Sequence, residues 1–225
     1  MPETFRSFVI RIADETRAPN IFAFHKEYLT EHLWPRTLAE FRELATNGAL
    51  YEAIETTSGA EDMVGLCYIM HGQEPTPPNA ERGEFGGVYV TENCRSLGLA
   101  SCLGKAAISN HFAWDPPKGR LIAHVHEDNS LPRDLLEKRL GFFRNGEESP
   151  PASAVPPSMK RNAGGQVVGH LFEFRRKTLI DFASWIETAS EVIETKKGAR
   201  IRISLPSFKE HKTSTVEALR GLGAA

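Results

Sequence analysis

The stretch that decides the fold is residues 88–100, which read Val88-Tyr89-Val90-Thr91-Glu92-Asn93-Cys94-Arg95-Ser96-Leu97-Gly98-Leu99-Ala100. Its first three residues are typical of a strand, and the small and apolar residues from Gly98 onward predict a helix. The first N–H groups of a helix have no partner within it and carry a partial positive charge, which suits a pyrophosphate. Gly98 and Ala100 would let phosphate oxygens approach the backbone, and Arg95 adds a planar guanidinium. Taken alone, the motif is explained more simply as a tight strand-to-helix turn packed with small residues.

The residues on either side of this turn predict a mixed α/β domain. We expect strands over residues 6–12, 49–55, 63–70, 84–90, 120–126, 142–147 and 166–175. We expect helices over two parts of 19–49 separated by Pro35, over 98–112 and over 131–140. The proline-containing segments 73–82 and 148–165 predict loops. This order indicates a sheet that is largely antiparallel in its first half, with βαβ-like connections behind it.

A second motif follows the expected strand at 120–126, and the two motifs together resemble the GCN5-related N-acetyltransferase (GNAT) superfamily. The first is similar to the acyl-CoA pyrophosphate loop of that family, V-x-P-x-x-R/Q-G-x-G-x-G/A. It matches at Val90, Arg95, Gly98 and Ala100, and it departs at Glu92, where proline is usual, and at Ser96, where glycine is usual. The second is similar to the family's N-x-x-A…Y-E-K-L-G-F stretch, and it matches at Asn129, Glu137, Lys138, Leu140, Gly141 and Phe142.

The resemblance implies an α/β (α+β) domain over residues 1–175, with a mixed, mostly antiparallel sheet flanked by helices. Residues 176–225 would then form a C-terminal extension. The resemblance also implies direct transfer of an acetyl or similar acyl group from acetyl-CoA or another acyl-CoA to an amine, on a small molecule or on a protein.

The same resemblance implies which residues hold the co-substrate. Val88 and Val90 would contact the pantetheine arm through their backbones, and Asn129 would lie beside the thioester end. Arg133, with Lys138 and Arg139, would meet the 3′-phosphate, although exposed helix charge is the commoner explanation for this group. Phosphate contacts are implied for Arg95, Ser96, Leu97, Gly98, Leu99 and Ala100.

One departure from the family bears on activity. Many members place a tyrosine in the second motif, where it protonates the leaving thiolate, but here Leu136 and Glu137 stand nearby and no tyrosine follows Tyr89. A catalytically inactive CoA-binding sensor or interaction module is therefore the alternative function.

Three side chains are candidates for acid–base or metal chemistry. Glu84 lies six residues before Val90, so regular alternation would place both on one face of the strand, where Glu84 is a candidate base. A solvated carboxylate at the start of a strand is the alternative. His124 and His126 share a face as two metal ligands would, but only Glu127 or Asp128 could supply a third ligand, so we expect no metal. His126, near Asn129, is the weaker alternative as a site-lining group.

Composition narrows the function classes further. With 27 Lys and Arg against 29 Asp and Glu, the net charge is −2, so no global positive field gathers nucleic acid. No apolar run approaches the roughly 20 residues that span a bilayer, and the first residues lack a signal-peptide pattern. We therefore expect no membrane partner. The three cysteines have no CxxC spacing, which indicates reduced thiols in a cytoplasmic protein.

The C-terminal residues predict an amphipathic helix over 177–197, an alternating strand over 200–205 and a polar tail from Lys209. The apolar stripe of this helix is wide enough to require burial. A homodimer interface, a lid and a cover over one side of the sheet are three alternatives that the sequence leaves open for the helix and its Trp185.

Overall fold

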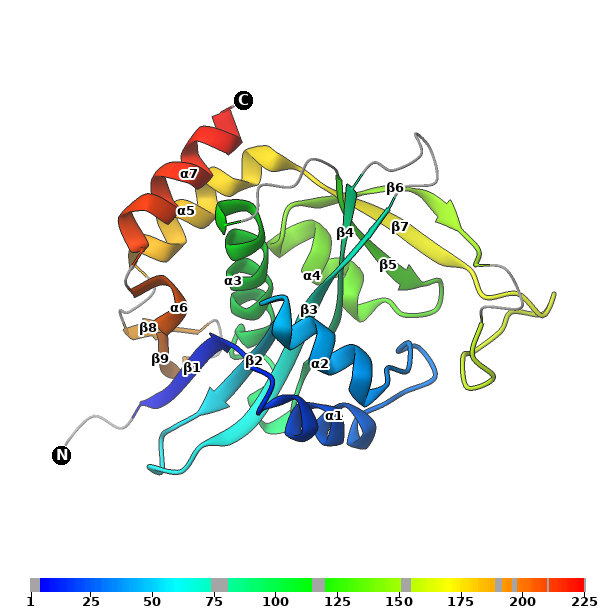
Figure 1. Cartoon of the computed structure of the whole chain (residues 1–225), viewed down its shortest axis with the longest axis horizontal. Coiled ribbons are helices and arrows are strands. Elements are labelled where there is room, and N and C mark those ends of the chain that lie inside the picture. The colour runs from blue at the N-terminus through cyan, green and yellow to red at the C-terminus, as the bar shows by residue number, and fades with distance from the viewer. Residues whose placement is uncertain are drawn as a thin grey trace.

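The computed structural model describes residues 5–73, 81–114, 120–150, 155–188, 192–195, 198–209 and 211–224 (Figure 1). The strands are β1 (Arg6–Ile12), β2 (Leu50–Glu55), β3 (Asp62–Gln73), β4 (Glu81–Val90), β5 (Arg120–His126), β6 (Phe142–Glu148), β7 (Gly169–Phe174), β8 (Val192–Glu194) and β9 (Arg200–Ser204). The helices are α1 (Ala18–Glu27), α2 (Leu38–Thr46), α3 (Leu99–Trp114), α4 (Leu131–Arg139), α5 (Leu179–Thr188), α6 (Pro206–Lys209) and α7 (Lys212–Ala224). Short 3-10 turns are η1 (Glu92–Cys94) and η3 (Arg176–Thr178). Up to β7, the order of elements is the one that the sequence predicts.

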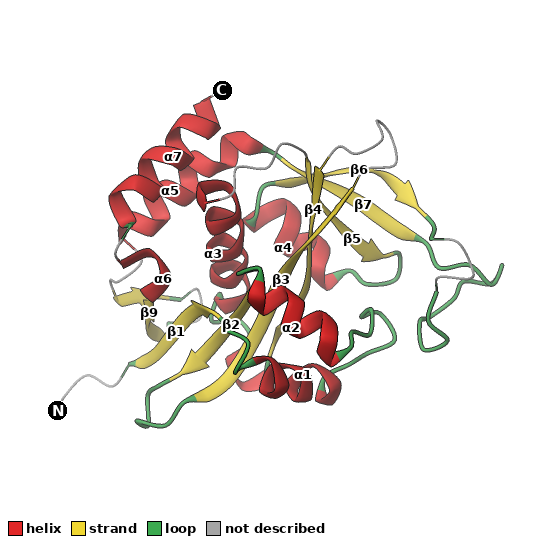
Figure 2. Cartoon of the chain, viewed as in Figure 1, coloured by secondary structure: helices red, strands yellow, loops and turns green. Residues whose placement is uncertain are grey.

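The strands form one sheet in the order β6-β7-β5-β4-β3-β2-β1-β9-β8 (Figure 2). Neighbours from β1 to β4 pair antiparallel, and so do β5, β7 and β6. β4 and β5 run parallel, with α3 in the connection between them, which is the expected βαβ unit. The structure thus confirms the mixed, mostly antiparallel α/β fold class.

Two hydrophobic cores lie on opposite faces of this sheet. On one face, Phe85 of β4 joins a cluster with Leu103 of α3. On the other face, Ile21 of α1 and Phe41 of α2 join a cluster with Leu66 of β3. The core that a strand residue joins therefore shows which face of the sheet its side chain occupies.

Local sequence explains how α1 and α2 are separated. Pro35 lies between them, and α2 begins with a capping box in which Thr37 and Glu40 each accept a backbone N–H of the other. Gly48, with a φ of +64°, follows the end of α2. Of the expected loops, residues 74–80 and 151–154 lie outside the described part of the chain.

The C-terminal extension corrects two sequence expectations. The helix expected over 177–197 ends at Thr188 as α5, and Val192–Glu194 forms β8, which pairs antiparallel with β9. Because Val192 and Ile193 are β-branched, they favour a strand where a pairing edge is available. The segment after Lys209, expected to be a polar tail, contains α7, since Val216 and Leu219 are buried in the core.

The apolar stripe of α5 is covered within this chain. Leu179, Phe182 and Ile186 are buried in the same cluster as the α3 residues, and Trp185 packs against it half-buried. Figure 1 shows α5 and α7 side by side at one end of the molecule. The expected strand at 200–205 is confirmed as β9, which pairs in parallel with β1. The stripe therefore acts as a cover for the core.

Candidate active site

The sheet opens between its two central parallel strands. β4 and β5 pair only at Arg82–Arg120, Gly83–Leu121 and Glu84–Ile122. Beyond these pairs, β4 continues along β3 to Val90, whereas β5 continues along β7 to His126. An opening therefore lies between the two strands. Within the described residues, β4 beyond Glu84 and β5 beyond Ile122 do not pair with each other across it.

The backbone of β4 points hydrogen-bonding groups into this opening. Thr91 donates its N–H to the carbonyl of Val64 on the β3 side, at 2.9 Å. Because successive backbone groups along a strand point to opposite edges, the N–H groups of Val90 and Val88 point toward the β5 side. These are the two residues for which main-chain contacts were expected.

A bulge in β4 changes which face Glu84 occupies. The register between β3 and β4 shifts between Leu66, which pairs with Tyr89, and Tyr68, which pairs with Gly86, so that Gly87 and Val88 both lie opposite Cys67. Gly87 has a φ of +62°, and a Cβ there would lie 2.0 Å from the Tyr68 ring, so this position requires glycine.

The expectation that Glu84 and Val90 share a strand face is therefore wrong. Val90 joins the core that contains α3, whereas Glu84 pairs with Met70, which packs on the α1 and α2 side. The extra residue of the bulge reverses the alternation between the two positions. Glu84 thus belongs to the face that α1, α2 and their connecting loop cover.

The turn between β4 and α3 offers backbone donors around open space. Ser96 and Gly98 have φ values of +70° and +85°, and a Cβ on Gly98 would meet nothing within 4 Å. The first helical hydrogen bond runs from the Cys102 N–H to the Gly98 carbonyl, at 3.1 Å. The N–H groups of the first turn, those of Leu99, Ala100 and Ser101, therefore have no partner within the helix.

Arg95 adds a cation beside this turn. Its side chain is half exposed; the guanidinium lies 5.8 Å from the centroid of the Tyr89 ring and 3.2 Å from a Glu92 carboxylate oxygen. A pyrophosphate needs hydrogen-bond donors around a space that it can enter. The turn provides N–H groups that have no partner within the helix, the half-exposed guanidinium of Arg95, and open space at Gly98. The residues present therefore fit the phosphate end of acyl-CoA.

Asn129 and Arg133 lie just after β5. The N–H of Asn129 donates to the carbonyl of His126 at 2.9 Å, so Asn129 is held at the end of the strand beside the opening. Arg133, in the first turn of α4, donates to the carbonyl of Glu127. Lys138 pairs with Asp134 on the exposed side of α4, at 2.9 Å.

The structure places Glu84 in contact with a histidine. His124 Nδ1 lies 3.0 Å from Glu84 Oε1, and His124 Nε2 lies 2.9 Å from Glu148 Oε2. Burial disfavours the charged imidazole, but its hydrogen bonds to Glu84 and then Glu148 outweigh that effect and raise the pKa of His124. Burial likewise disfavours the charged carboxylate of Glu84, but the hydrogen bond from His124, together with the positive charges of His124, Arg82 and Arg36, outweighs it and lowers the pKa of Glu84.

His126 uses both of its ring nitrogens. Nδ1 accepts the N–H of Asp128 at 3.2 Å, and Nε2 lies 2.9 Å from the carbonyl oxygen of Lys160, to which it donates. This pattern describes a neutral ring with its proton on Nε2. In this arrangement, His126 could take a proton from a substrate only by giving up the hydrogen bond that Nδ1 accepts from Asp128. His126 and His124 do lie on the same face of β5, but they have different partners.

Two loops meet over the side of the sheet that Glu84 faces. Trp34, between α1 and α2, packs against Val155, Met159 and Val167, which lie between β6 and β7. The N–H of Lys160 donates to the Glu31 carbonyl at 3.0 Å. The described part of the proline-containing loop is therefore joined to the α1–α2 loop.

The position where the family has its tyrosine carries no hydroxyl group. Leu136 of α4 is buried in the core, and Glu137 is exposed. The leaving thiolate would have to take its proton from elsewhere.

Sequence reasoning missed the contacts that His124 makes with Glu84 and Glu148. The sequence relates His124 only to His126, since the two alternate on one strand, and it predicts a loop at Glu148. The contacts to Glu84 depend on β5 lying between β4 and β7, with β6 at the edge. A local sequence pattern does not reveal this order of strands. The one local signal for Glu148 is that it is a charged residue at the end of a short strand.

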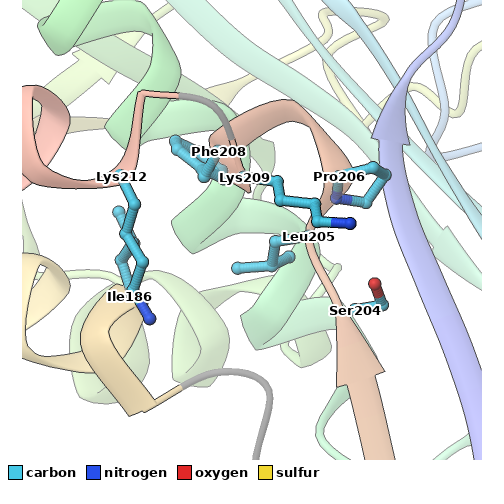
Figure 3. A pocket seen from close by; sticks show the side chains of 7 residues that line it. All are labelled: Ile186, Ser204, Leu205, Pro206, Phe208, Lys209 and Lys212. Carbon is cyan, nitrogen blue, oxygen red and sulfur yellow. The ribbon is translucent and has the colours of Figure 1, made fainter.

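A cavity of about 310 Å³ lies elsewhere, among α5, β9, α6 and α7 (Figure 3). Its lining consists of Ile186, Ser204, Leu205, Pro206, Phe208, Lys209 and Lys212. Lys212 Nζ already donates to the carbonyl of Glu187 at 2.7 Å. This cavity belongs to the C-terminal extension and has no part in the opening between β4 and β5.

Within the described ranges, no group of three or more His, Cys, Asp or Glu side chains is placed to hold a metal ion. Cys67, Cys94 and Cys102 are all buried free thiols. None of the helices that the structure describes is long and apolar enough to cross a membrane.

The fold and the opening define a GNAT-type acetyltransferase fold, and comparison with solved structures agrees. No family model and no curated protein sequence matches the chain. Its structure superimposes on that of the NatC complex bound to Gag peptide and CoA with a TM-score of 0.56 and 17% identity, over 74% of this chain and 97% of the other.

Two bacterial structures give the same result. An acetyltransferase of the GNAT family from Streptococcus pneumoniae matches with a TM-score of 0.52 and 19% identity, over 74% of this chain and 98% of that one. The ribosomal-protein-S18-alanine N-acetyltransferase from Escherichia coli matches with a TM-score of 0.51 and 12% identity, over 74% and 92% of the two chains. The resemblance inferred from the two motifs is thus confirmed at the level of the fold.

Proposed function

We propose that this chain transfers an acetyl or similar acyl group from acyl-CoA to an amine by direct transfer. The single observation that carries the proposal is the opening between β4 and β5, which ends at the first turn of α3. It combines a strand edge that has no ladder partner across the opening with a cluster of helix N–H groups around open space at Gly98. An extended thiol arm that ends in a pyrophosphate needs these two features next to each other.

We assign the two ends of acyl-CoA to different residues. Backbone groups of Val88 and Val90 would hold the pantetheine arm, and Asn129, possessing a carboxamide at the end of β5, would lie beside the thioester. Arg133 would approach the 3′-phosphate. The pyrophosphate would rest on the residues of the turn, namely Arg95, Ser96, Leu97, Gly98, Leu99 and Ala100.

The chemistry that acyl-CoA supplies is an activated thioester carbonyl. The protein has to orient the amine, hold it neutral and take up its proton. Glu84 is the proposed base because its carboxylate lies on the covered face, at the last ladder pair before the opening. His126 remains the weaker alternative, and both of its nitrogens are engaged.

We place the acceptor amine between the α1–α2 loop and the loop between β6 and β7, since these two loops meet over the Glu84 face. The acceptor is a small-molecule amine or the amine of a protein, and the peptide in the NatC structure favours testing short peptides first. The three free thiols support a cytoplasmic location as part of the proposal.

The test is amine-dependent release of free thiol from acetyl-CoA, measured against amines, polyamines, amino acids and short peptides with free N-termini. We expect at least one class of amine to give thiol release above the rate without an amine. A folded protein whose melting temperature does not change with millimolar CoA, and which releases no thiol, would contradict the proposal.

A catalytically inactive CoA-binding sensor or interaction module is the second candidate. It is favoured by one observation, that α4 has buried Leu136 and exposed Glu137 where the family's tyrosine is usual. A melting temperature that rises with CoA, combined with no thiol release for any amine in the panel, would support this candidate over the enzyme.

A further inference from the structure

Side chains from three strands meet at the point where β4 and β5 separate. His124 of β5 has Glu84 of β4 on its Nδ1 side, at 3.0 Å, and Glu148 of β6 on its Nε2 side, at 2.9 Å. As an imidazolium, the ring donates a hydrogen bond to each carboxylate, so the three groups form one continuous line.

This line leads from the covered face toward solvent. The side chains of Glu84 and His124 are 26% and 25% exposed, whereas that of Glu148 is 47% exposed. Glu148 is the last residue of β6, and β6 is the strand at the edge of the sheet. A proton held at Glu84 therefore has a hydrogen-bonded route of two contacts to an exposed carboxylate.

We propose that Glu84 and His124 together accept the proton that the acceptor amine loses, and that Glu148 passes this proton to solvent. The inference rests on the proposed acyl transfer and deepens it. Glu84 is the group that faces the substrate, while His124 and Glu148 act through Glu84 and are positioning residues for the proton.

The proton balance of the reaction requires such an exit. An amine that enters as an ammonium ion loses two protons as its nitrogen bonds to the carbonyl carbon and the carbon–sulfur bond breaks. One proton ends on the released thiol, and the other must reach the solvent. Glu84 takes the second proton and delivers it to Nδ1 of a neutral His124 that carries its own proton on Nε2. The resulting imidazolium loses a proton through Glu148 and returns to the accepting tautomer by exchange with water.

Glu148 can be substituted without changing the charged groups that surround Glu84. Arg82 of β4 and Arg36 of the α1–α2 loop act on Glu84, and Tyr68 of β3 is also near it. The β7 residue paired with His124 is the apolar Leu171. The carboxylates of Glu84 and Glu148 contact the two nitrogens of the His124 ring, so removing Glu148 changes the imidazole and leaves the surroundings of Glu84 in place.

The experiment compares Glu148→Gln with the control Glu147→Gln. Glu147 is also an exposed residue of β6, but it pairs with Arg144 and His170 instead of His124. For each protein, the His124 ring is titrated by NMR, with its signal assigned from a His124→Gln variant, and the pH–rate profile of thiol release is measured on the best amine of the panel.

We expect the rate of the parent protein to rise with pH as His124 loses its proton. Glu148→Gln should move both the NMR midpoint and the rising part of the profile to lower pH by about one unit, because one of two stabilising carboxylates is lost. Glu147→Gln should move neither. His124→Gln should lower the rate at neutral pH by roughly 10²-fold, with a smaller deficit at high pH. An effect of the amine's own ionisation is the same in every variant and cancels in the comparison.

The outcomes separate this inference from the proposed function. A parent protein that releases no thiol with any amine overturns the proposed function, and the inference with it. A parent that does release thiol, with a profile that Glu148→Gln leaves in place or moves no more than Glu147→Gln does, overturns the proton route alone. The same holds if His124→Gln lowers the rate equally at all pH values, since that is the result of a merely structural role.

Discussion

Two carboxylates on the sheet, Glu52 of β2 and Glu84 of β4, have partners of different kinds. Glu52 is fully buried and accepts hydrogen bonds from Arg17 at 2.8 Å and Arg11 at 2.9 Å. Glu84 is part-exposed and contacts His124 at 3.0 Å. Arginine does not lose its proton at any pH at which the protein is folded, whereas histidine titrates near neutrality.

The difference separates a structural ion pair from a site that can exchange a proton. Around Glu52, every partner is a permanent cation, so the cluster can hold β1, β2 and the start of α1 together but has no proton to give or take. Around Glu84, the partner is itself titratable and is linked to an exposed carboxylate. The two clusters should therefore respond to substitution in opposite ways, one in stability and the other in rate.

The largest effect should come from Glu84→Gln, which keeps the shape of the side chain but removes the base. The rate of acyl transfer at neutral pH should fall by roughly 10²–10⁴-fold. The deficit should shrink at high pH, where the amine is already neutral, and the affinity for CoA should not change. A pH–rate profile of parent and variant tests this.

Profiles of the parent and Glu84→Gln that run parallel, with a gap below about threefold throughout, would reduce Glu84 to an ordinary carboxylate. In that case bulk water or His126 would be the proton acceptor. Glu147→Gln serves as the control for a lost charge on the same sheet, and its profile should match that of the parent.

The next effect should be on stability at the other cluster. Glu52→Gln removes the buried charge that Arg11 and Arg17 share, and it should lower the free energy of unfolding by about 3 kcal/mol. Glu61→Gln removes an exposed partner of the same Arg11 and should cost far less, because solvent screens that pair. Urea unfolding of the three proteins measures both values, and similar losses for the two variants would contradict the contrast.

The smallest effect should be the pH dependence of stability at the Glu84 cluster. The pKa of folded His124 is raised above 6.5, so its contribution is full below that pH and is lost as the pH rises through the folded value. The pKa of folded Glu84 is lowered below 4.5, so its contribution is present above that pH and is lost as the pH falls through the folded value.

The cluster should therefore stabilise the fold most between pH 4.5 and 6.5. His124→Gln should cost about 1 kcal/mol at pH 6 and less at pH 9, while the loss caused by Glu52→Gln should stay constant between these values. Unfolding measured at the two pH values is the check, and a His124→Gln loss that grows with pH would contradict the assigned contacts.

The sequence predicts the parts of this site that are local in the chain. The turn from Val90 to Ala100 is a continuous segment whose residue types alone indicate strand, turn and helix, and the structure places it at the mouth of the opening. The sequence also predicts strand β5 with its observed bounds, Arg120–His126.

The parts that could not be predicted depend on contacts between distant segments. The bulge at Gly87 and Val88 reverses the face of Glu84, and it is visible only in the register with β3. The line from Glu84 to Glu148 needs the order of β4, β5, β7 and β6. In the C-terminal extension, Val192–Glu194 is a strand because β9 pairs with it, and no local periodicity reports that pairing.

The most direct test of the central claim is calorimetric titration of the protein with acetyl-CoA, comparing the parent with Gly98→Glu and Gly59→Glu. Both glycines have a positive φ, +85° and +83°, and a Cβ at either would meet nothing within 4 Å. The two substitutions therefore impose a similar backbone strain, but only Gly98 lies at the first turn of α3.

The account predicts saturable binding by the parent and by Gly59→Glu, and no binding by Gly98→Glu, with all three proteins folded as judged by circular dichroism. A glutamate at residue 98 would place a bulky negative side chain where phosphate oxygens approach the helix N–H groups. Binding by Gly98→Glu as tight as that of the parent, or a folded parent that binds no acetyl-CoA at millimolar concentration, would contradict the claim that the opening between β4 and β5 is an acyl-CoA site.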